Sequence, residues 1–202
     1  MASVEAVEVV LFDLGGVLID FGGVDAMREL AGIDTDDEVW RRWLACEWVR
    51  AFERGHCSPE EFAAGVVADW GLPIDGPAYL AEFSGWLGGP LPGAAELVDE
   101  VARVARIGCL SNTNPVHWVH WERWPFAERF EFRFLSFELG HVKPDRALFE
   151  HVAGLLPVEP AQVLFVDDNL VNVEGARAVG FQAEHARGPA EARRALVERG
   201  VL

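Results

Sequence analysis

The sequence is poor in basic residues and in long apolar runs. It has 17 basic residues against 33 acidic ones, which gives a formal net charge of −16. This balance argues against nucleic acid or an anionic membrane surface as a partner, because both require basic patches. No window reaches the roughly 18 uninterrupted apolar residues of a membrane span. The first residues also lack the basic segment that opens a signal peptide.

Cysteine is scarce as well. Cys46, Cys57 and Cys109 are odd in number and show no CxxC spacing, which favours reduced thiols over a disulfide framework. We therefore expect a cytoplasmic protein. A length of 202 residues suits one domain, or one domain with a modest insert. The sequence leaves open whether the protein is a monomer or a homodimer.

Short apolar runs alternate with helical patterns over most of the chain. The runs at 10–13 and 163–168 are continuously apolar until they reach an acidic residue, as in strands buried on both faces of a parallel sheet, and the second strand is expected at 162–167. The alternation predicts an α/β fold with a parallel sheet that helices cover on both faces. Further strands are expected at 107–111, 132–136 and 181–185, and helices at 94–106, 115–130, 145–156, 170–179 and 189–199.

The segment from about 25 to 87 interrupts this alternation with helices only, expected at 26–31, 38–54, 58–70 and 78–87. Ser58 followed by Pro59 is typical of a helix start, and the glycines and prolines of 88–93 indicate a linker. The sequence thus predicts an α/β core formed by 1–19 and 88–202. A small helical cap at 20–87 is inserted after the first strand, where it would overhang the carboxyl edge of the sheet. Ligand crevices of α/β folds lie at that edge.

Polar residues stand where the predicted strands end. Asp13 and the pair Asp167 and Asp168 follow two strands, Ser111 ends a third, and Lys143 is the only lysine of the chain. Each residue alone could be a helix cap or a turn residue, but all fall at one edge of the sheet. Clustered carboxylates repel one another unless a cation neutralises them, and an all-oxygen cluster suits Mg²⁺.

These groups suit phosphoryl transfer. Asp13 could attack phosphorus and form an aspartyl phosphate. Asp168, assisted by Asp167, could hold Mg²⁺ against Asp13 and a phosphate oxygen. Ser111 and the backbone N–H groups of Asn112 and Thr113 could donate to phosphoryl oxygens, and Lys143 would supply a positive point charge.

Four segments that carry these residues resemble the motifs of the haloacid dehalogenase-like (HAD) hydrolases. They are Leu-Phe-Asp-Leu-Gly-Gly-Val-Leu at 11–18, Leu-Ser-Asn-Thr-Asn at 110–114, Val-Lys-Pro-Asp at 142–145 and Phe-Val-Asp-Asp-Asn at 165–169 with Asn172 beyond it. The resemblance implies a Rossmann-like core, a small C1-type cap, Mg²⁺ and an aspartyl-phosphate intermediate on Asp13. Within the family, the first two segments are most similar to bacterial sugar-phosphate phosphatases of the α-glucose-1-phosphate phosphatase type. The expected substrate is a small phosphorylated metabolite such as a sugar phosphate.

One position departs from the family pattern. Most phosphatases of this family have a second Asp two residues after the nucleophile, as general acid and base, and Gly15 stands there in this chain. The Gly15 carbonyl could still bind Mg²⁺, but a positioned general acid typically contributes about 10²–10⁴ in rate. Three explanations are open: a substrate whose leaving group needs little protonation, an acid supplied by another residue or by the substrate, or a protein with little hydrolase activity.

Two other functions are compatible with the motifs. One is a non-hydrolytic binding or regulatory protein on the same fold, and the other is a metal-independent 2-haloacid dehalogenase, which also lacks the acid. In the predicted cap, Glu47 and Arg50 are candidates for substrate contact, whereas Arg54 and His56 flank a Gly55 turn and are expected in solvent.

Overall fold

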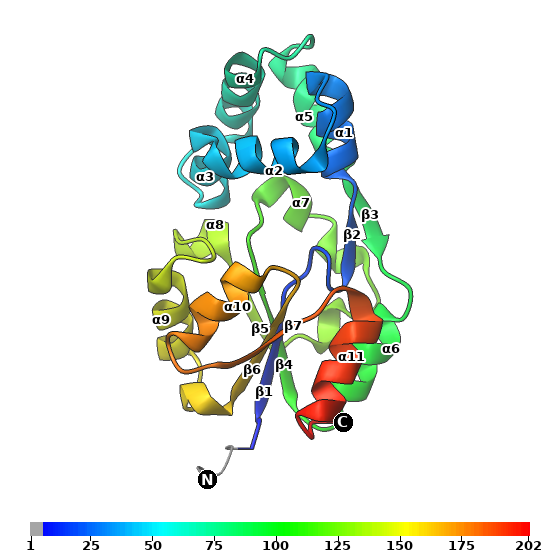
Figure 1. Cartoon of the computed structure of the whole chain (residues 1–202), viewed down its shortest axis with the longest axis vertical. Coiled ribbons are helices and arrows are strands. Elements are labelled where there is room, and N and C mark those ends of the chain that lie inside the picture. Colours follow the sequence, from blue (N-terminus) through cyan, green and yellow to red (C-terminus); the bar gives the residue numbers. More distant parts are fainter. Residues whose placement is uncertain (1–5) are drawn as a thin grey trace.

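A five-stranded parallel sheet forms the centre of the computed structural model, which describes residues 6–202 (Figure 1). Every neighbouring pair of its strands is parallel. The predicted α/β fold is therefore confirmed. In spatial order, the strands are β5 (Phe132–Leu135), β4 (Arg106–Ser111), β1 (Val9–Phe12), β6 (Val163–Asp167) and β7 (Gln182–His185).

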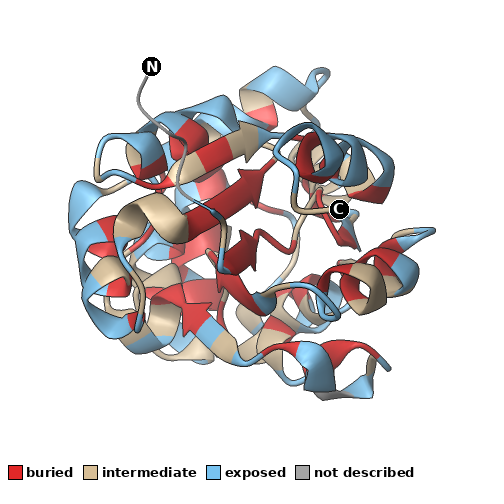
Figure 2. Cartoon of the chain, turned by 90° about the horizontal axis from the view of Figure 1, so that it is seen from below, coloured by how far each residue is buried: buried red, intermediate tan, exposed pale blue. Residues whose placement is uncertain are grey.

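Helices cover both faces of the sheet, and the central strands are buried (Figure 2). Val10 and Phe12 of β1 pack with two helices on one face, and Val9 and Leu11 pack with two others on the opposite face. The strand therefore has no polar side, which explains its continuous apolar run. The helices against Val10 and Phe12 are α6 (Ala94–Val101) and α11 (Gly188–Glu198). The helices against Val9 and Leu11 are α9 (Arg146–Leu155) and α10 (Leu170–Arg177).

The five helices that come between β1 and β4 in the chain have an apolar core of their own. Aromatic rings fill it, and Phe52 and Phe62 stack with their centroids 4.3 Å apart. Figure 1 shows these helices at the end of the molecule toward which β1 runs. They are α1 (Gly23–Ala31), α2 (Asp36–Ala45), α3 (Glu47–Glu53), α4 (Pro59–Trp70) and α5 (Gly76–Ser84).

A short antiparallel ribbon joins the five helices to the rest of the chain. It consists of β2 (Ile19–Phe21) and β3 (Leu87–Pro90), with Ile19 opposite Pro90. The expected linker at 88–93 is thus partly a strand. Glycine and proline, which are rare inside strands, hid it in the sequence, but they are tolerated in a two-stranded ribbon with free edges.

Several predicted helices are shorter than expected. The helix predicted at 38–54 is broken at Cys46, whose backbone is extended (φ −69°, ψ 120°) and separates α2 from α3. The start of α4 is confirmed, since Ser58 and Glu61 form a reciprocal capping box. The stretch at 115–130, predicted as one helix, contains only α7 (Pro115–Trp118) and the 3₁₀ turns Trp121–Arg123 and Ala127–Arg129. Two further short elements are α8 (Ser136–Leu139), which follows β5, and the 3₁₀ turn Pro160–Gln162. Within 6–202, no helix has the length and apolarity needed to cross a bilayer.

Candidate active site

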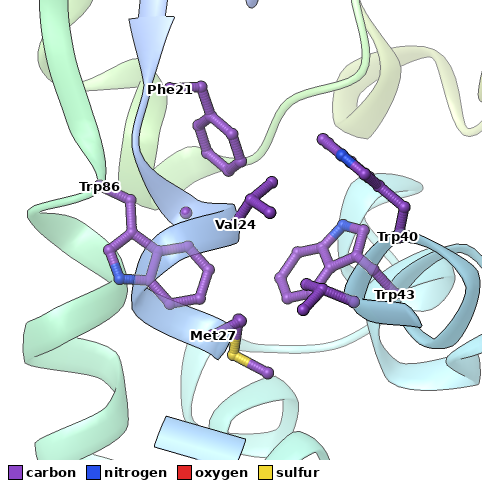
Figure 3. Close-up of a pocket in the computed structure, with 8 residues that line it drawn as sticks. Phe21, Val24, Met27, Trp40, Trp43 and Trp86 are labelled. Carbon is purple, nitrogen blue, oxygen red and sulfur yellow. The ribbon is translucent and has the colours of Figure 1, made fainter. Parts of the chain in front are cut away.

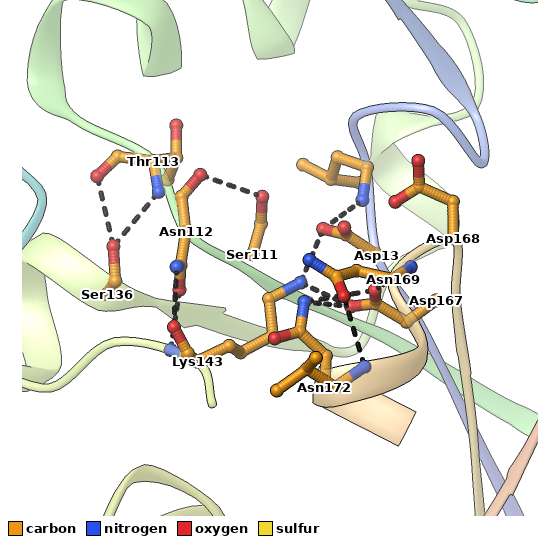
Figure 4. Close-up of polar contacts among 12 residues, drawn as sticks. Asp13, Ser111, Asn112, Thr113, Ser136, Lys143, Asp167, Asp168, Asn169 and Asn172 are labelled. Carbon is orange, nitrogen blue, oxygen red and sulfur yellow. Dashed lines mark hydrogen bonds and ion pairs between the residues drawn. The ribbon is translucent and has the colours of Figure 1, made fainter. Parts of the chain in front are cut away.

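The ammonium group of Lys143 lies at the centre of the candidate site (Figure 4). Its Nζ is 2.8 Å from Oδ1 of Asp13 and 2.7 Å from Oδ2 of Asp167, and only 2% of the side chain is exposed. Asp13 directly follows β1, and Asp167 ends β6. Because these strands are parallel neighbours, their carboxyl ends meet at one edge of the sheet. The structure thus brings together residues that are far apart in the sequence.

Asp168 adds a third carboxylate to this edge. One oxygen from each of Asp13, Asp167 and Asp168 lies within 4.8 Å of the other two. Burial and the two neighbouring carboxylates together raise the pKa of Asp13 to about 7, although the Lys143 ammonium opposes the rise. Burial, and then Asp167, also raise the pKa of Asp168. Three carboxylates therefore face one ammonium, and a divalent cation would neutralise the surplus of two negative charges. The oxygen-only donor set fits a hard cation such as Mg²⁺.

The Asp167 carboxylate is saturated with hydrogen bonds from the protein. Its Oδ1 accepts from the Asn169 backbone N–H (2.8 Å) and from Asn172 Nδ2 (3.0 Å). Its Oδ2 accepts from Lys143 Nζ and, at 3.1 Å, from Asn172 Nδ2. Asp167 is fully buried. Its geometry is that of a group that holds Lys143 in place. Asn172 lies in α10. In the sequence, only its place beyond the Phe-Val-Asp-Asp-Asn motif pointed to its contact with Asp167.

The Asp13 carboxylate is held at one oxygen. Oδ1 accepts from the Leu14 backbone N–H at 2.7 Å, in addition to its ion pair with Lys143. Among the residues that the structure describes, no hydrogen bond reaches Oδ2. One oxygen is thus fixed by two donors, while the other is available to an external partner.

The residues after β4, which were expected to bind the phosphoryl group, form several hydrogen bonds with other parts of the protein. The Asn112 side chain donates to the Lys143 carbonyl (3.0 Å) and accepts from the Lys143 N–H (2.8 Å), so it fixes the backbone that carries the lysine. The Thr113 N–H donates to Ser136 Oγ at 2.9 Å and is not free for a phosphoryl oxygen. Ser136 could not be identified from the sequence, because only the pairing of β4 with β5 places it there. Ser111 is buried at the end of β4, beside these residues.

Gly15 and Gly16 differ in whether a side chain would fit at their position. Gly16 has a left-handed backbone (φ +72°), and a Cβ there would lie 2.3 Å from Asp168 Oδ2. Only glycine suits that position. A Cβ at Gly15 would meet no atom within 4 Å, and its φ is outside the left-handed region. A side chain at position 15 is therefore sterically possible beside the nucleophile candidate.

Helix α3 approaches the sheet edge through its second half. Arg54 Nη2 lies 2.6 Å from Asp145 Oδ2, and Arg50 Nη2 lies 4.0 Å from Oδ1 of the same residue. The expectation that Arg54 is merely solvated is wrong, because the fold places the end of α3 on the loop after Lys143. Glu47 is exposed, with no ion pair or hydrogen bond to the described part of the chain. Glu53, which shares a helix face with Arg50, was not identified from the sequence.

Comparison with known proteins gives three informative similarities. A sesquiterpene phosphatase from Aspergillus oryzae is 29% identical over 182 residues, covering 87% of each protein. A HAD family enzyme from Bacteroides thetaiotaomicron, solved in complex with magnesium and inorganic phosphate, is 22% identical with a TM-score of 0.74, covering 90% of this chain and 95% of that one. L-2-haloacid dehalogenase from Xanthobacter autotrophicus is 27% identical with a TM-score of 0.67, covering 89% of this chain and 77% of that one.

The family assignment rests on a separate match, which covers most of the chain. Residues 7–180 match the family description haloacid dehalogenase-like hydrolase, and this range includes Asp13, Lys143 and the Asp167–Asp168 pair. The structural neighbours share the fold of the parallel sheet and its helices. The chain belongs to the haloacid dehalogenase-like hydrolases.

Proposed function

We propose that the protein is a Mg²⁺-dependent phosphatase that hydrolyses a small phosphorylated metabolite through an aspartyl phosphate on Asp13. The observation that carries this proposal is the position of Asp13, with one oxygen held by Lys143 and Leu14 and the other without a hydrogen bond to the described residues. Such a carboxylate is oriented for attack on phosphorus. The names of two similar proteins, a phosphatase and an enzyme bound to magnesium and phosphate, support it.

The other residues would orient the reactants and balance their charge. Lys143 would attract the phosphoryl group and steady Asp13, while Asp167 keeps Lys143 in place. Ser111 and the Asn112 backbone N–H are the candidate donors to the phosphoryl oxygens. Asn112 would contribute further through its side chain, which fixes the Lys143 backbone.

The metal would be held by Asp13, Asp168 and the Gly15 carbonyl, with Asp167 beside them. When bound, Mg²⁺ would neutralise the carboxylates and the phosphate charge. Asp168 suits this role because it is only half-buried and, among the described residues, its carboxylate has no ion pair.

Two substrate classes follow from the helices beyond the sheet edge, which we propose act as a cap. A sugar phosphate is the first, because the polar side chains of α3, including Glu47 and Arg50, could meet its hydroxyl groups. A phosphate ester with an isoprenoid tail is the second. The name of the similar sesquiterpene phosphatase supports it, and the inserted helices carry a small apolar hollow between α1, α2 and the β2–β3 ribbon (Figure 3). The hollow is lined by Phe21, Gly23, Val24, Met27, Val39, Trp40, Trp43 and Trp86.

The alternatives make different demands on the same site. A metal-independent dehalogenase has no need of Asp168 beside Asp13 and Asp167, and the surplus negative charge would oppose a 2-haloacid anion. A binding or regulatory protein would not require the buried ion pair of Lys143 with Asp13. Both therefore explain less of the site than phosphoryl transfer does.

Metal removal provides the first test. Phosphate release is measured for sugar phosphates, acyl phosphates, a prenyl monophosphate and p-nitrophenyl phosphate, with Mg²⁺ or with EDTA. We expect EDTA to lower release about 10²-fold or more, because the metal supplies several kcal/mol of charge stabilisation, and added Mg²⁺ to restore it. The ranking of sugar and prenyl esters decides between the two classes. Release that is equal with EDTA and with Mg²⁺ would contradict the metal site.

A second test restores a carboxyl group at position 15. Gly15→Asp is expected to raise turnover of alkyl phosphates, relative to p-nitrophenyl phosphate, on the order of tenfold, because only alkoxide leaving groups need protonation. The free space at Gly15 allows the change without displacing a neighbour. Gly15→Asn is the matched control, since it has the same size but no transferable proton. Equal effects on both substrates would refute the leaving-group explanation.

A further inference from the structure

The groups around Asp13 provide no evident proton donor for the leaving oxygen. Burial lowers the pKa of Lys143, but the flanking carboxylates of Asp13 and Asp167 outweigh it and hold that pKa above its usual range. Such an ammonium is a poor acid. His185, at the end of β7, donates from Nε2 to the Asp168 carbonyl oxygen at 2.8 Å. An alkoxide nevertheless needs a proton as it leaves.

The last residue of α3, Glu53, is placed firmly against this edge of the sheet. Before it, Phe52 is buried and stacks on Phe62 of α4. After it, Arg54 pairs with Asp145, and a Cβ at Gly55 would lie 2.3 Å from the Phe137 carbonyl oxygen. The helix therefore ends in direct contact with α8 and with the loop after Lys143.

The Glu53 carboxyl is half-buried there, and it has no hydrogen bond or ion pair among the residues that the structure describes. Burial raises its pKa to about 7, although the positive charges of Lys143, Arg50 and Arg54 oppose the rise. Three helices pack against α3, and their acidic residues, such as Asp37 of α2, Glu61 of α4 and Glu138 of α8, are not among the charges that shift the Glu53 pKa. Among the charges that oppose this rise, that of Lys143 is the largest, and α3 ends on the loop that follows this lysine, where Arg54 pairs with Asp145.

We propose that Glu53 is the general acid and base of the reaction, supplied by the inserted helices rather than by the strand end. The inference rests on the proposed phosphatase function. As an Asp13 oxygen bonds to phosphorus, the bond from phosphorus to the ester oxygen breaks, and its electron pair takes the Glu53 proton to give the free alcohol. The Glu53 carboxylate then accepts a proton from the water that attacks the phosphoaspartate. Inorganic phosphate leaves, and both carboxyl groups return to their starting states.

The test compares leaving groups in Glu53→Gln, which keeps the size but cannot transfer the proton. Its kcat/KM for glycerol 2-phosphate should fall about 10²–10⁴-fold, while that for p-nitrophenyl phosphate falls by less than about tenfold, since that anion leaves without protonation. The decline of wild-type kcat/KM for glycerol 2-phosphate as pH rises through about 7 should disappear in the variant. Glu82→Gln, on the exposed end of α5, is the control and should match the wild type.

A double variant separates proton transfer from positioning. Adding Gly15→Asp to Glu53→Gln should restore most of the lost turnover of glycerol 2-phosphate, whereas adding Gly15→Asn should not. If Glu53→Gln slows both substrates equally, or slows neither, the general-acid role is overturned. If the Gln variant does not fold, Glu53→Ala, which also removes the carboxyl, carries the same comparison of leaving groups. Failure of the phosphatase proposal itself would look different: the wild type would release no phosphate that depends on Asp13.

Discussion

Asp13→Asn is expected to lower phosphate release about 10⁴-fold or more, which is the scale of losing a nucleophile. The substitution removes the attacking oxyanion but keeps the shape of the side chain and the oxygen that can accept from Leu14. A carboxamide nitrogen cannot form the aspartyl phosphate. The measurement is release under saturating Mg²⁺ from the best substrate of the panel, together with trapping of the phosphoenzyme in the wild type.

The variant should remain folded. It removes one of the two carboxylates that pair with Lys143, and Asp167 keeps the other ion pair. Circular dichroism and the unfolding midpoint would verify this. Asp69→Asn, on the exposed side of α4, is the matched control and should keep full activity. Substantial turnover by folded Asp13→Asn would show that another group attacks phosphorus.

The sequence predicted the parts of the fold that depend on local pattern. The apolar runs before Asp13 and Asp167 identified two central strands, because strands buried on both faces leave no polar alternation. Ser58 marked the start of α4 through its capping box. Lys143 was a candidate because it is the only lysine, and its ammonium lies between the two carboxylates in the structure.

Features that depend on contacts distant in the sequence were missed. The chain bends at Cys46, although the residues on both sides favour helix, because α2 and α3 pack separately in the aromatic core of the inserted helices. Arg54 and Glu53 gain their places from the loop after Lys143, which begins some ninety residues later along the chain; Arg54 and Asp145 are 91 residues apart. No local pattern specifies such a contact, so a polar helix end was interpreted as solvated.

Lys143→Met is expected to destabilise the protein by about 3–5 kcal/mol at neutral pH, because it leaves buried carboxylates without their counter-charge. Only 2% of the Lys143 side chain is exposed, and it pairs with both Asp13 and Asp167. Urea unfolding measures the change. Arg194→Met is the control: its surface pair with Glu191, at 3.7 Å, should contribute only about 0–1 kcal/mol.

The pH dependence of this loss identifies its cause. Without the ammonium, the pKa of Asp13, already raised by burial, rises further. The native state then binds more protons than the unfolded chain above the ordinary aspartate pKa of about 3.9, so stability falls as pH rises. The deficit of Lys143→Met should therefore be smaller at pH 5 than at pH 8, and saturating Mg²⁺ should reduce it at pH 8 because the cation replaces the missing charge. A deficit that is equal at both pH values, with or without Mg²⁺, would assign the role of Lys143 to packing rather than to charge.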